Sequence, residues 1–269
     1  MPSSGFAFSP ASAGRPLKVA AFMSGSGSNI RRLLERRSPH YEVAFIFSDR
    51  ADGKCQGEKI ALEYGLPYFS LDTRRFHQLR GQKRTVLTKE GLKTRRAYDA
   101  VAARLVRAFG VDLLALGGYM SFLTLKKGVN VHPADLSILG AKGHRRFVGD
   151  DAVYDAIAAG QKELKASTLW IDQGVDSGPL LMVSEPLPVD LPAPLEELLE
   201  DSARLRRVAD EHQEALKQLG DWVIFPLTVE LMALGRLTVN ARGLAELDGR
   251  EYPQGVRPGD LGVGPGGGR

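Results

Sequence analysis

Short, continuous apolar runs alternate with segments of helical spacing over the first half of the chain. The first cycle is an apolar run at 17–23, a glycine-rich turn, and a helical pattern at 30–37. Later cycles keep this order, with apolar runs at 43–47, 68–71 and 113–116 and helical patterns at 57–64 and 88–109. Runs without polar alternation are typical of parallel strands covered on both faces. The sequence therefore predicts an α/β fold.

The pattern changes after Tyr119. A strand is expected at 128–133 and a short helix at 151–159, and two strands at 166–171 and 179–183 are expected to pair as a hairpin. The prediction is an open, twisted, mostly parallel but mixed sheet with helices on both faces. A charged amphipathic helix is expected at 195–219, and a second helix at 221–234 should kink at Pro226.

The 269 residues suit one large domain with appendages. Residues 1–16 are rich in Ser, Gly, Ala and Pro and are expected to form a flexible arm. Residues 17–243 are expected to form the folded domain, and 244–269 a flexible tail rich in Gly and Pro.

Composition narrows the class of protein. The single cysteine, Cys55, cannot form an internal disulfide, and no apolar run approaches the roughly 20 residues that cross a bilayer. A basic run at 80–96 is expected to be a solvated face, because like-charged runs usually are. The scattered histidines lack metal-ligand spacing. These features predict a cytoplasmic protein with no metal, no nucleic-acid partner and no membrane partner; a homodimer is left open.

The turn at 24–29 lies where α/β sheets bind anions. Its glycines let the backbone approach a ligand, and the following helix presents unpaired N–H groups. It is neither the dinucleotide fingerprint, since Ile30 replaces the third glycine, nor a Walker loop. Two interpretations stay open. One is a tight turn in which Ser28 caps the helix; the other is a phosphate site made by Ser26, Gly27, Ser28 and Asn29.

Asn130 and His132 are spaced to share one face at the carboxyl end of a strand. A carboxamide can polarise a carbonyl while an imidazole moves a proton. For this pair alone, a structural histidine is the simpler interpretation. The other histidines, His40, His77, His144 and His212, are expected at the surface.

Asp176 lies in a glycine-flanked loop between the two hairpin strands. A carboxylate there could hold His132 in its charged form and raise its pKa. An Asx turn that leads into the strand is an equally good interpretation.

Taken in order, five segments resemble the folate-dependent formyltransferase family: 24–29, 95–99, 117–120, 130–133 and 175–179. The resemblance runs from about residue 18 to 240. It implies a Rossmann-like formyltransferase fold and formyl transfer from 10-formyltetrahydrofolate, a co-substrate, to the amine of a phosphorylated small molecule. The likeness is greatest to the branch that formylates glycinamide ribonucleotide in de novo purine biosynthesis. The family needs no metal.

By this resemblance, Asn130, His132 and Asp176 fall on the catalytic residues. His132 would pass protons, Asn130 would stabilise an oxyanion, and Asp176 would orient His132. The substrate would be held by Ser26, Gly27, Ser28, Asn29 and Asp221. The folate would contact Arg95, Met120, Ser121, Phe122, Leu123, Asp172, Gln173, Gly174 and Val175.

The chain departs from the family pattern near this expected site. Ser121 replaces an arginine, Leu169 replaces a histidine, and residues 138–148 resemble an insertion. Other acceptors therefore stay open, namely an amino-sugar nucleotide or water, the latter giving a formyltetrahydrofolate hydrolase. A non-catalytic protein that binds a phosphorylated ligand is the alternative from another class.

Overall fold

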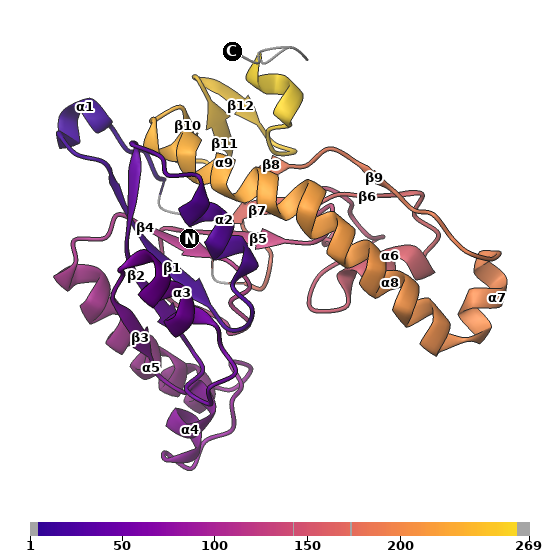
Figure 1. Cartoon of the computed structure of the whole chain (residues 1–269), viewed down its shortest axis with the longest axis horizontal. Helices are drawn as coiled ribbons and strands as arrows, with labels where there is room; N and C mark the ends of the chain where they lie inside the picture. Colours follow the sequence, from indigo (N-terminus) through magenta and orange to yellow (C-terminus); the bar gives the residue numbers. More distant parts are fainter. Residues whose placement is uncertain (1–4, 142, 173, 263–269) are drawn as a thin grey trace.

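The computed structural model describes residues 5–141, 143–172 and 174–262 of the chain. A seven-stranded sheet in the order β3-β2-β1-β4-β5-β7-β8 forms its centre (Figure 1). Its strands are β1 (Leu17–Met23), β2 (Tyr41–Ser48), β3 (Tyr68–Ser70), β4 (Leu113–Leu116), β5 (Gly128–His132), β7 (Ser167–Trp170) and β8 (Leu180–Val183). Strands β1 to β5 are parallel, and β7 is antiparallel to both β5 and β8. The predicted mixed sheet and hairpin are confirmed.

The two faces of the sheet bury separate apolar cores. Along β1, Val19 and Ala21 belong to one core and Ala20 and Phe22 to the other, and all four side chains are fully buried. The first core packs under α2 (Ser28–Glu35), α3 (Gly57–Tyr64) and α9 (Trp222–Ala233), and the second under α4 (Thr73–Gln78) and α5 (Lys89–Ala108). Burial on both faces explains why the central strands β1 and β4 are almost entirely apolar.

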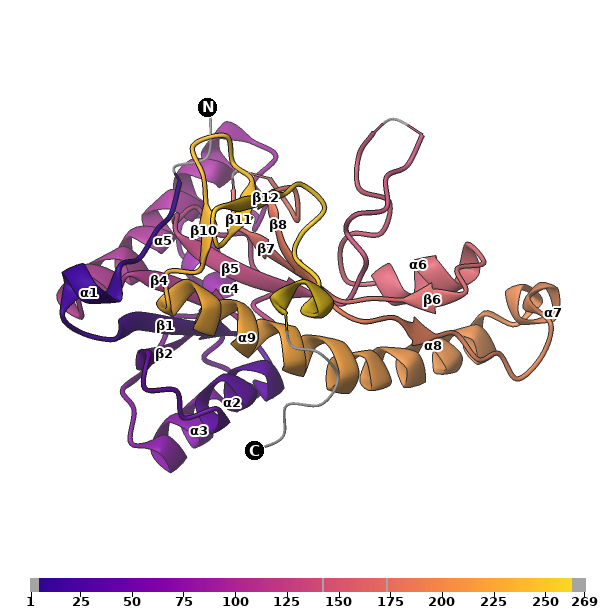
Figure 2. The ribbon, with the colours of Figure 1, turned by 90° about the horizontal axis from the view of Figure 1, so that it is seen from above.

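Beyond the sheet, a lobe extends away from the main body (Figure 2). It contains α6 (Ala152–Ala158), α7 (Leu195–Glu200), α8 (Ser202–Leu216) and the paired strands β6 (Glu163–Leu164) and β9 (Leu187–Pro188). The expected single helix at 195–219 is instead divided at Asp201, whose side chain accepts a hydrogen bond from the Arg204 amide and caps α8.

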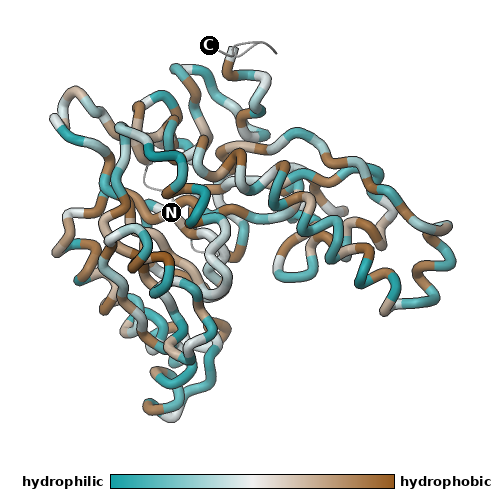
Figure 3. The backbone as a smooth tube through the Cα atoms, in the orientation of Figure 1, coloured by the Kyte–Doolittle hydropathy of each residue, from teal (hydrophilic) through white to brown (hydrophobic). Residues whose placement is uncertain are grey.

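A π-helical turn, Lys217–Asp221, joins α8 to α9. Pro226 does not end α9, which continues to Ala233 with Pro226 buried. Helix α9 is apolar on nearly all sides (Figure 3), as a helix packed in a core must be. The π-helical turn ends at Asp221, which is buried and hydrogen-bonded to Asn29 of α2.

The chain ends differ from the expected arm and tail. Phe6 pairs with Val239, and its ring lies 5.2 Å from that of Trp170. Residues after 243 form β11 (Ala245–Leu247) and β12 (Arg250–Tyr252), which extend β10 (Leu237–Val239) into a second sheet. Val256 is fully buried. The prediction of a flexible tail from residue 244 is therefore wrong for the described part, since a few apolar side chains suffice to anchor this hairpin to the core. Helix α1 (Pro10–Ala13) and a 3₁₀ turn (Pro258–Leu261) complete the elements.

Candidate active site

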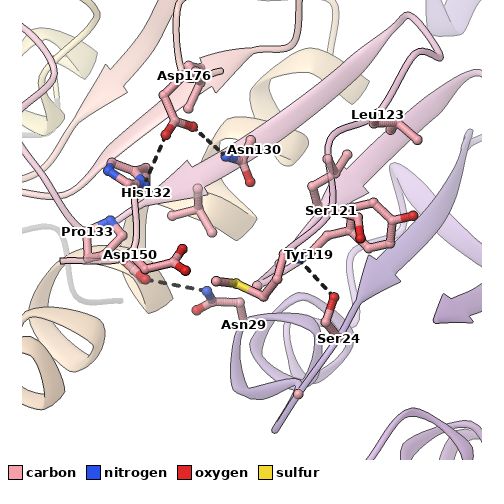
Figure 4. A pocket seen from close by; sticks show the side chains of 18 of the residues that line it. Ser24, Asn29, Tyr119, Ser121, Leu123, Asn130, His132, Pro133, Asp150 and Asp176 are labelled. Carbon is pink, nitrogen blue, oxygen red and sulfur yellow. Dashed lines mark hydrogen bonds and ion pairs between the residues drawn. The ribbon is translucent and has the colours of Figure 1, made fainter. Parts of the chain in front are cut away.

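A cavity of about 530 Å³ opens at the carboxyl ends of β1, β4 and β5 (Figure 4). From β1 the chain proceeds to β2 and β3 on one side and to β4 and β5 on the other. Ligands of open α/β sheets bind at such a switch point. The cavity's size is typical of small-molecule sites.

The turn after β1 forms one end of the cavity. Gly27 has φ +71°, a left-handed conformation that favours glycine, and a Cβ atom there would press on the Cε atom of Met23 at 2.4 Å. Ser28 does not cap α2, contrary to one interpretation of the sequence: Gly27 is the cap residue, and no described side chain caps the helix. The N-terminus of α2 therefore has no capping side chain, and Ser28 and Asn29 of its first turn line the cavity. Such a helix N-terminus suits an anion.

Asn130, His132 and Asp176 converge on the opposite wall. Asn130 Nδ2 donates to Asp176 Oδ1 at 3.4 Å, and His132 Nδ1 lies 3.8 Å from Asp176 Oδ2. Figure 4 shows the carboxylate facing both side chains. Asn130 and His132 share a face of β5, as predicted, and the loop after β7 folds back over that face. A movement of about 1 Å would bring His132 and Asp176 into hydrogen-bonding distance.

The electrostatics of His132 differ from the sequence expectation. Burial lowers the pKa of His132, and this effect outweighs the opposing influence of the Asp176 carboxylate. Asp176 thus supports the charged form, but the net shift is downward. A neutral imidazole can accept a proton, and a nearby carboxylate then stabilises the imidazolium that forms.

Asp221 enters the cavity beside the turn. Asn29 Nδ2 donates to its Oδ2 at 3.4 Å. The other oxygens, Oδ1 of Asp221 and Oδ1 of Asn29, are buried and have no hydrogen-bond partner within the described part of the chain. Two such acceptors side by side are suited to donor groups of a ligand. Burial also raises the pKa of Asp221 to about 7.

Asp221→Asn should stabilise the ligand-free protein at high pH. Because the pKa is near 3.8 when exposed and about 7 when folded, ionisation of Asp221 opposes folding increasingly as pH rises between these values. The full penalty is about 4 kcal/mol above pH 7. Urea denaturation should show a higher free energy of unfolding for the variant at pH 8 and no gain near pH 4. Exposed Asp210→Asn is the control. An equal gain at both pH values would contradict the assignment.

The predicted folate-facing residues line the same cavity, with two exceptions. Met120, Ser121, Phe122 and Leu123 follow β4, and Asp172, Gly174 and Val175 follow β7. Asp172 Oδ1 accepts hydrogen bonds from Gly174 N at 2.9 Å and Ser177 Oγ at 2.8 Å, which stabilises the loop. Gln173 lies outside the described residues.

Arg95 is the second exception, since it does not line the cavity. It is 3% exposed and forms a bidentate ion pair with Asp99, with N–O distances of 2.7 and 3.2 Å. It also donates to the Tyr119 hydroxyl at 3.1 Å. Its position in the basic run gave no sign of this burial; the other basic residues of that run are exposed. His77, expected at the surface, is also buried, with Nδ1 2.8 Å from the Thr73 carbonyl oxygen.

Several cavity residues were not predicted. Asp150 approaches from the segment before α6, and Arg50 and Lys217 bring positive charges from the end of β2 and the π-helical turn. The sequence signal for Asp150 was available, because Gly149 and Asp150 directly precede a helix. Arg50 pairs with Asp52 at 2.6 Å, and Lys217 pairs with Glu214 at 2.8 Å.

Within the parts of the chain that the structure describes, no group of three or more His, Cys, Asp or Glu residues could hold a metal ion. Among the helices of those parts, none is both long and apolar enough to span a membrane.

Comparison with known proteins identifies the family. The model of the family described as "Formyl transferase" matches residues 17–212, which include the turn after β1, β5 and the loop of Asp176. The chain belongs to the formyl transferase family.

The names of individual relatives state a particular activity or pathway. Phosphoribosylglycinamide formyltransferase of Haemophilus influenzae is 26% identical over 247 residues, covering 88% of this chain and 96% of that protein. The solved glycinamide ribonucleotide transformylase 1 of Symbiobacterium toebii superposes with a TM-score of 0.60 at 27% identity, over 87% of this chain and 96% of that one. The trifunctional purine biosynthetic protein adenosine-3 of Drosophila melanogaster is 26% identical over 180 residues. This chain covers 11% of the length of that Drosophila protein.

Proposed function

We propose that the protein transfers a formyl group from 10-formyltetrahydrofolate to the primary amine of a phosphorylated small molecule. Glycinamide ribonucleotide of de novo purine biosynthesis is the proposed acceptor, because the named relatives are phosphoribosylglycinamide formyltransferases. The observation that supports this most is that Asn130, His132 and Asp176 converge in one cavity with a glycine-rich turn at a helix N-terminus.

The cavity divides into two halves of suitable character. At one end, the N-terminus of α2 and the side chain of Lys217 suit a phosphate. The proposed phosphate ligands are Ser26, Gly27, Ser28 and Asn29. Asp221 is the fifth proposed substrate-binding residue, and its free carboxylate oxygen would accept from donor groups of the same substrate. At the other end, the walls after β4 and β7 present apolar side chains such as Phe122 and Leu123, which suit a flat heterocycle. Ser24 connects the two halves, since its hydroxyl accepts a hydrogen bond from the Met120 amide at 2.9 Å.

The three converging residues supply the chemistry between these ends. The acceptor amine attacks the formyl carbon, and the Asn130 amide donates to the oxygen, which becomes negatively charged. His132 takes the proton that the attacking nitrogen loses and returns a proton to the leaving nitrogen of the folate as the carbon–nitrogen bond breaks. Asp176 stabilises the imidazolium between these two proton transfers. The protein thus carries one proton from the attacking to the leaving nitrogen.

Formyl transfer should be tested with purified protein, 10-formyltetrahydrofolate and a panel of amines. Release of tetrahydrofolate should require glycinamide ribonucleotide and should not occur with its dephosphorylated form at the same concentration, because the turn after β1 would lose its anion. Release without any amine would indicate a hydrolase. Absence of turnover with every acceptor, despite folate binding, would contradict the proposal and favour a binding protein.

The residues that line the cavity also favour a second candidate acceptor, an amino-sugar nucleotide. Asp150, Ser121 and Leu169 all line the cavity, and Ser121 donates a hydrogen bond to buried Asp49. The carboxylate of Asp150 in this cavity suits an acceptor with a further cationic or hydroxyl group, as in an amino-sugar nucleotide. That compound belongs in the same panel, and a higher kcat/KM for it than for glycinamide ribonucleotide would reassign the acceptor.

The proposal includes a cytoplasmic location and two small-molecule partners, the folate and the phosphorylated amine, without a nucleic-acid or membrane partner. Sedimentation of the purified protein would distinguish a monomer from a homodimer.

A further inference from the structure

A hairpin between β5 and α6 reaches back to the loop that carries Asp176. Its base is paired: Leu139 bridges to Arg145, Gly140 N donates to the His144 carbonyl at 2.8 Å, and Arg146 N donates to the Ile138 carbonyl at 3.0 Å. Figure 2 shows this segment projecting from the body near α6. The pairing fixes the backbone from which the Arg145 side chain extends.

The Arg145 guanidinium contacts two carbonyl groups of the Asp176 loop. Nη1 donates to the main-chain oxygen of Asp176, and Nη2 donates to that of Gly178 at 2.5 Å. Farther along the same segment, Gly149 N lies 3.4 Å from Asp176 Oδ2. The segment from Arg145 to Gly149 therefore contacts both the backbone and the side chain of Asp176.

The backbone at Asp176 needs such support. Its φ of +48° lies in the left-handed region, which costs an aspartate more than a glycine, although aspartate adopts it more readily than most other residues. Gly178 is also confined, because a Cβ atom there would lie 1.8 Å from the Trp170 carbonyl oxygen. Two hydrogen bonds from one planar group across residues 176 and 178 would hold the turn in this conformation.

We infer that Arg145 is a positioning residue that holds the Asp176 carboxylate against His132 by bridging the carbonyl oxygens of Asp176 and Gly178. The two-point contact, and not the positive charge of Arg145, is what matters. Lysine keeps that charge but cannot reproduce the planar fork of a guanidinium. The kinetic part of this inference rests on the proposed function, whereas the structural part does not.

The ionisation of His132 reports the position of Asp176 directly. The charged groups that act on His132 are Asp176 and Asp150, which favour its charged form, and Arg145, which opposes it. If Arg145 is replaced by lysine and the Asp176 carboxylate moves away while His132 stays buried, His132 loses its largest favourable charge, and its pKa should fall. Loss of the positive charge alone would have the opposite sign.

The test uses Arg145→Lys in the full-length protein, with Arg146→Lys as the matched control. Arg146 is exposed, and its guanidinium lies over the Phe147 ring at 5.1 Å. NMR titration of His132 should show a lower pKa in Arg145→Lys and no change in the control. The kcat for formyl transfer should fall about 10-fold to 100-fold with KM for the amine nearly unchanged, since a displacement of about 1 Å can have such an effect.

The experiment can fail for the inference about Arg145 and for the proposed function independently. An unchanged His132 titration in Arg145→Lys would overturn the inference, whether or not the wild-type protein transfers formyl groups. A lower pKa without any wild-type turnover would support the inference and count against the proposed function. If Arg145→Lys does not fold, Arg145→Gln is titrated instead. A fall in the pKa of His132 then supports release of Asp176, and a rise, the effect of charge removal alone, contradicts it.

Discussion

His132→Ala should lower kcat for formyl transfer by about 10²-fold to 10⁴-fold, the range expected when a general acid–base group is removed. The imidazole is the group within the described trio that can both accept and return a proton near neutral pH. Its pKa is lowered by burial, so the neutral base predominates at pH 7. KM for the amine should change much less, because the phosphate end of the cavity is untouched. Steady-state kinetics at pH 7.5 would measure both parameters.

The control for this prediction is His144→Ala, since His144 is exposed on the projecting hairpin. Far-ultraviolet circular dichroism should be unchanged in both variants. If His132→Ala retained more than about a tenth of the wild-type kcat, far above the loss expected for a general acid–base group, another residue would have to move the proton.

Asp176→Asn should lower kcat by about 10²-fold to 10³-fold, as found when one electrostatic stabiliser of a transition state is removed. The substitution keeps the shape of the side chain but removes the charge that favours protonated His132. The pKa of His132 should therefore fall further. Because the base must be neutral, the acidic limb of the kcat/KM profile should move to lower pH while the maximum rate drops.

A pH–rate profile checks this second prediction, with Asp151→Asn as the control. Asp151 neighbours the cavity but is exposed and pairs with Arg206 at 2.7 Å. A profile that kept its position and height in Asp176→Asn would mean that the 3.8 Å approach of His132 and Asp176 has no catalytic role.

The central sheet could be predicted from sequence because its signal is local. Strands β1, β2 and β4 are largely apolar, and apolar residues in the helices between them recur at helical spacing. The common face of Asn130 and His132 followed from strand alternation alone. The position of Asp176 could not be derived from a local pattern. Only the resemblance to the family connected its loop with a strand more than 40 residues earlier.

Other features depend on tertiary contacts that no local pattern encodes. Arg95 is in a basic run, yet it is buried, and its partner Asp99 offsets part of the cost of burying the charge. The net pKa shift of His132 depends on the balance between burial and charge, and sequence gives only the charge. Residues after 243 appeared too polar to fold, but Ala245, Leu247 and Val256 anchor them to existing cores.

The most direct test of the account is a single-turnover reaction with 10-formyltetrahydrofolate that carries a ¹³C-labelled formyl group, followed by NMR in the presence of glycinamide ribonucleotide. The account predicts that the label appears on the acceptor nitrogen with the wild-type protein, and that this signal is lost in His132→Ala. Label that appears only in formate, or an undiminished signal in His132→Ala, would contradict it.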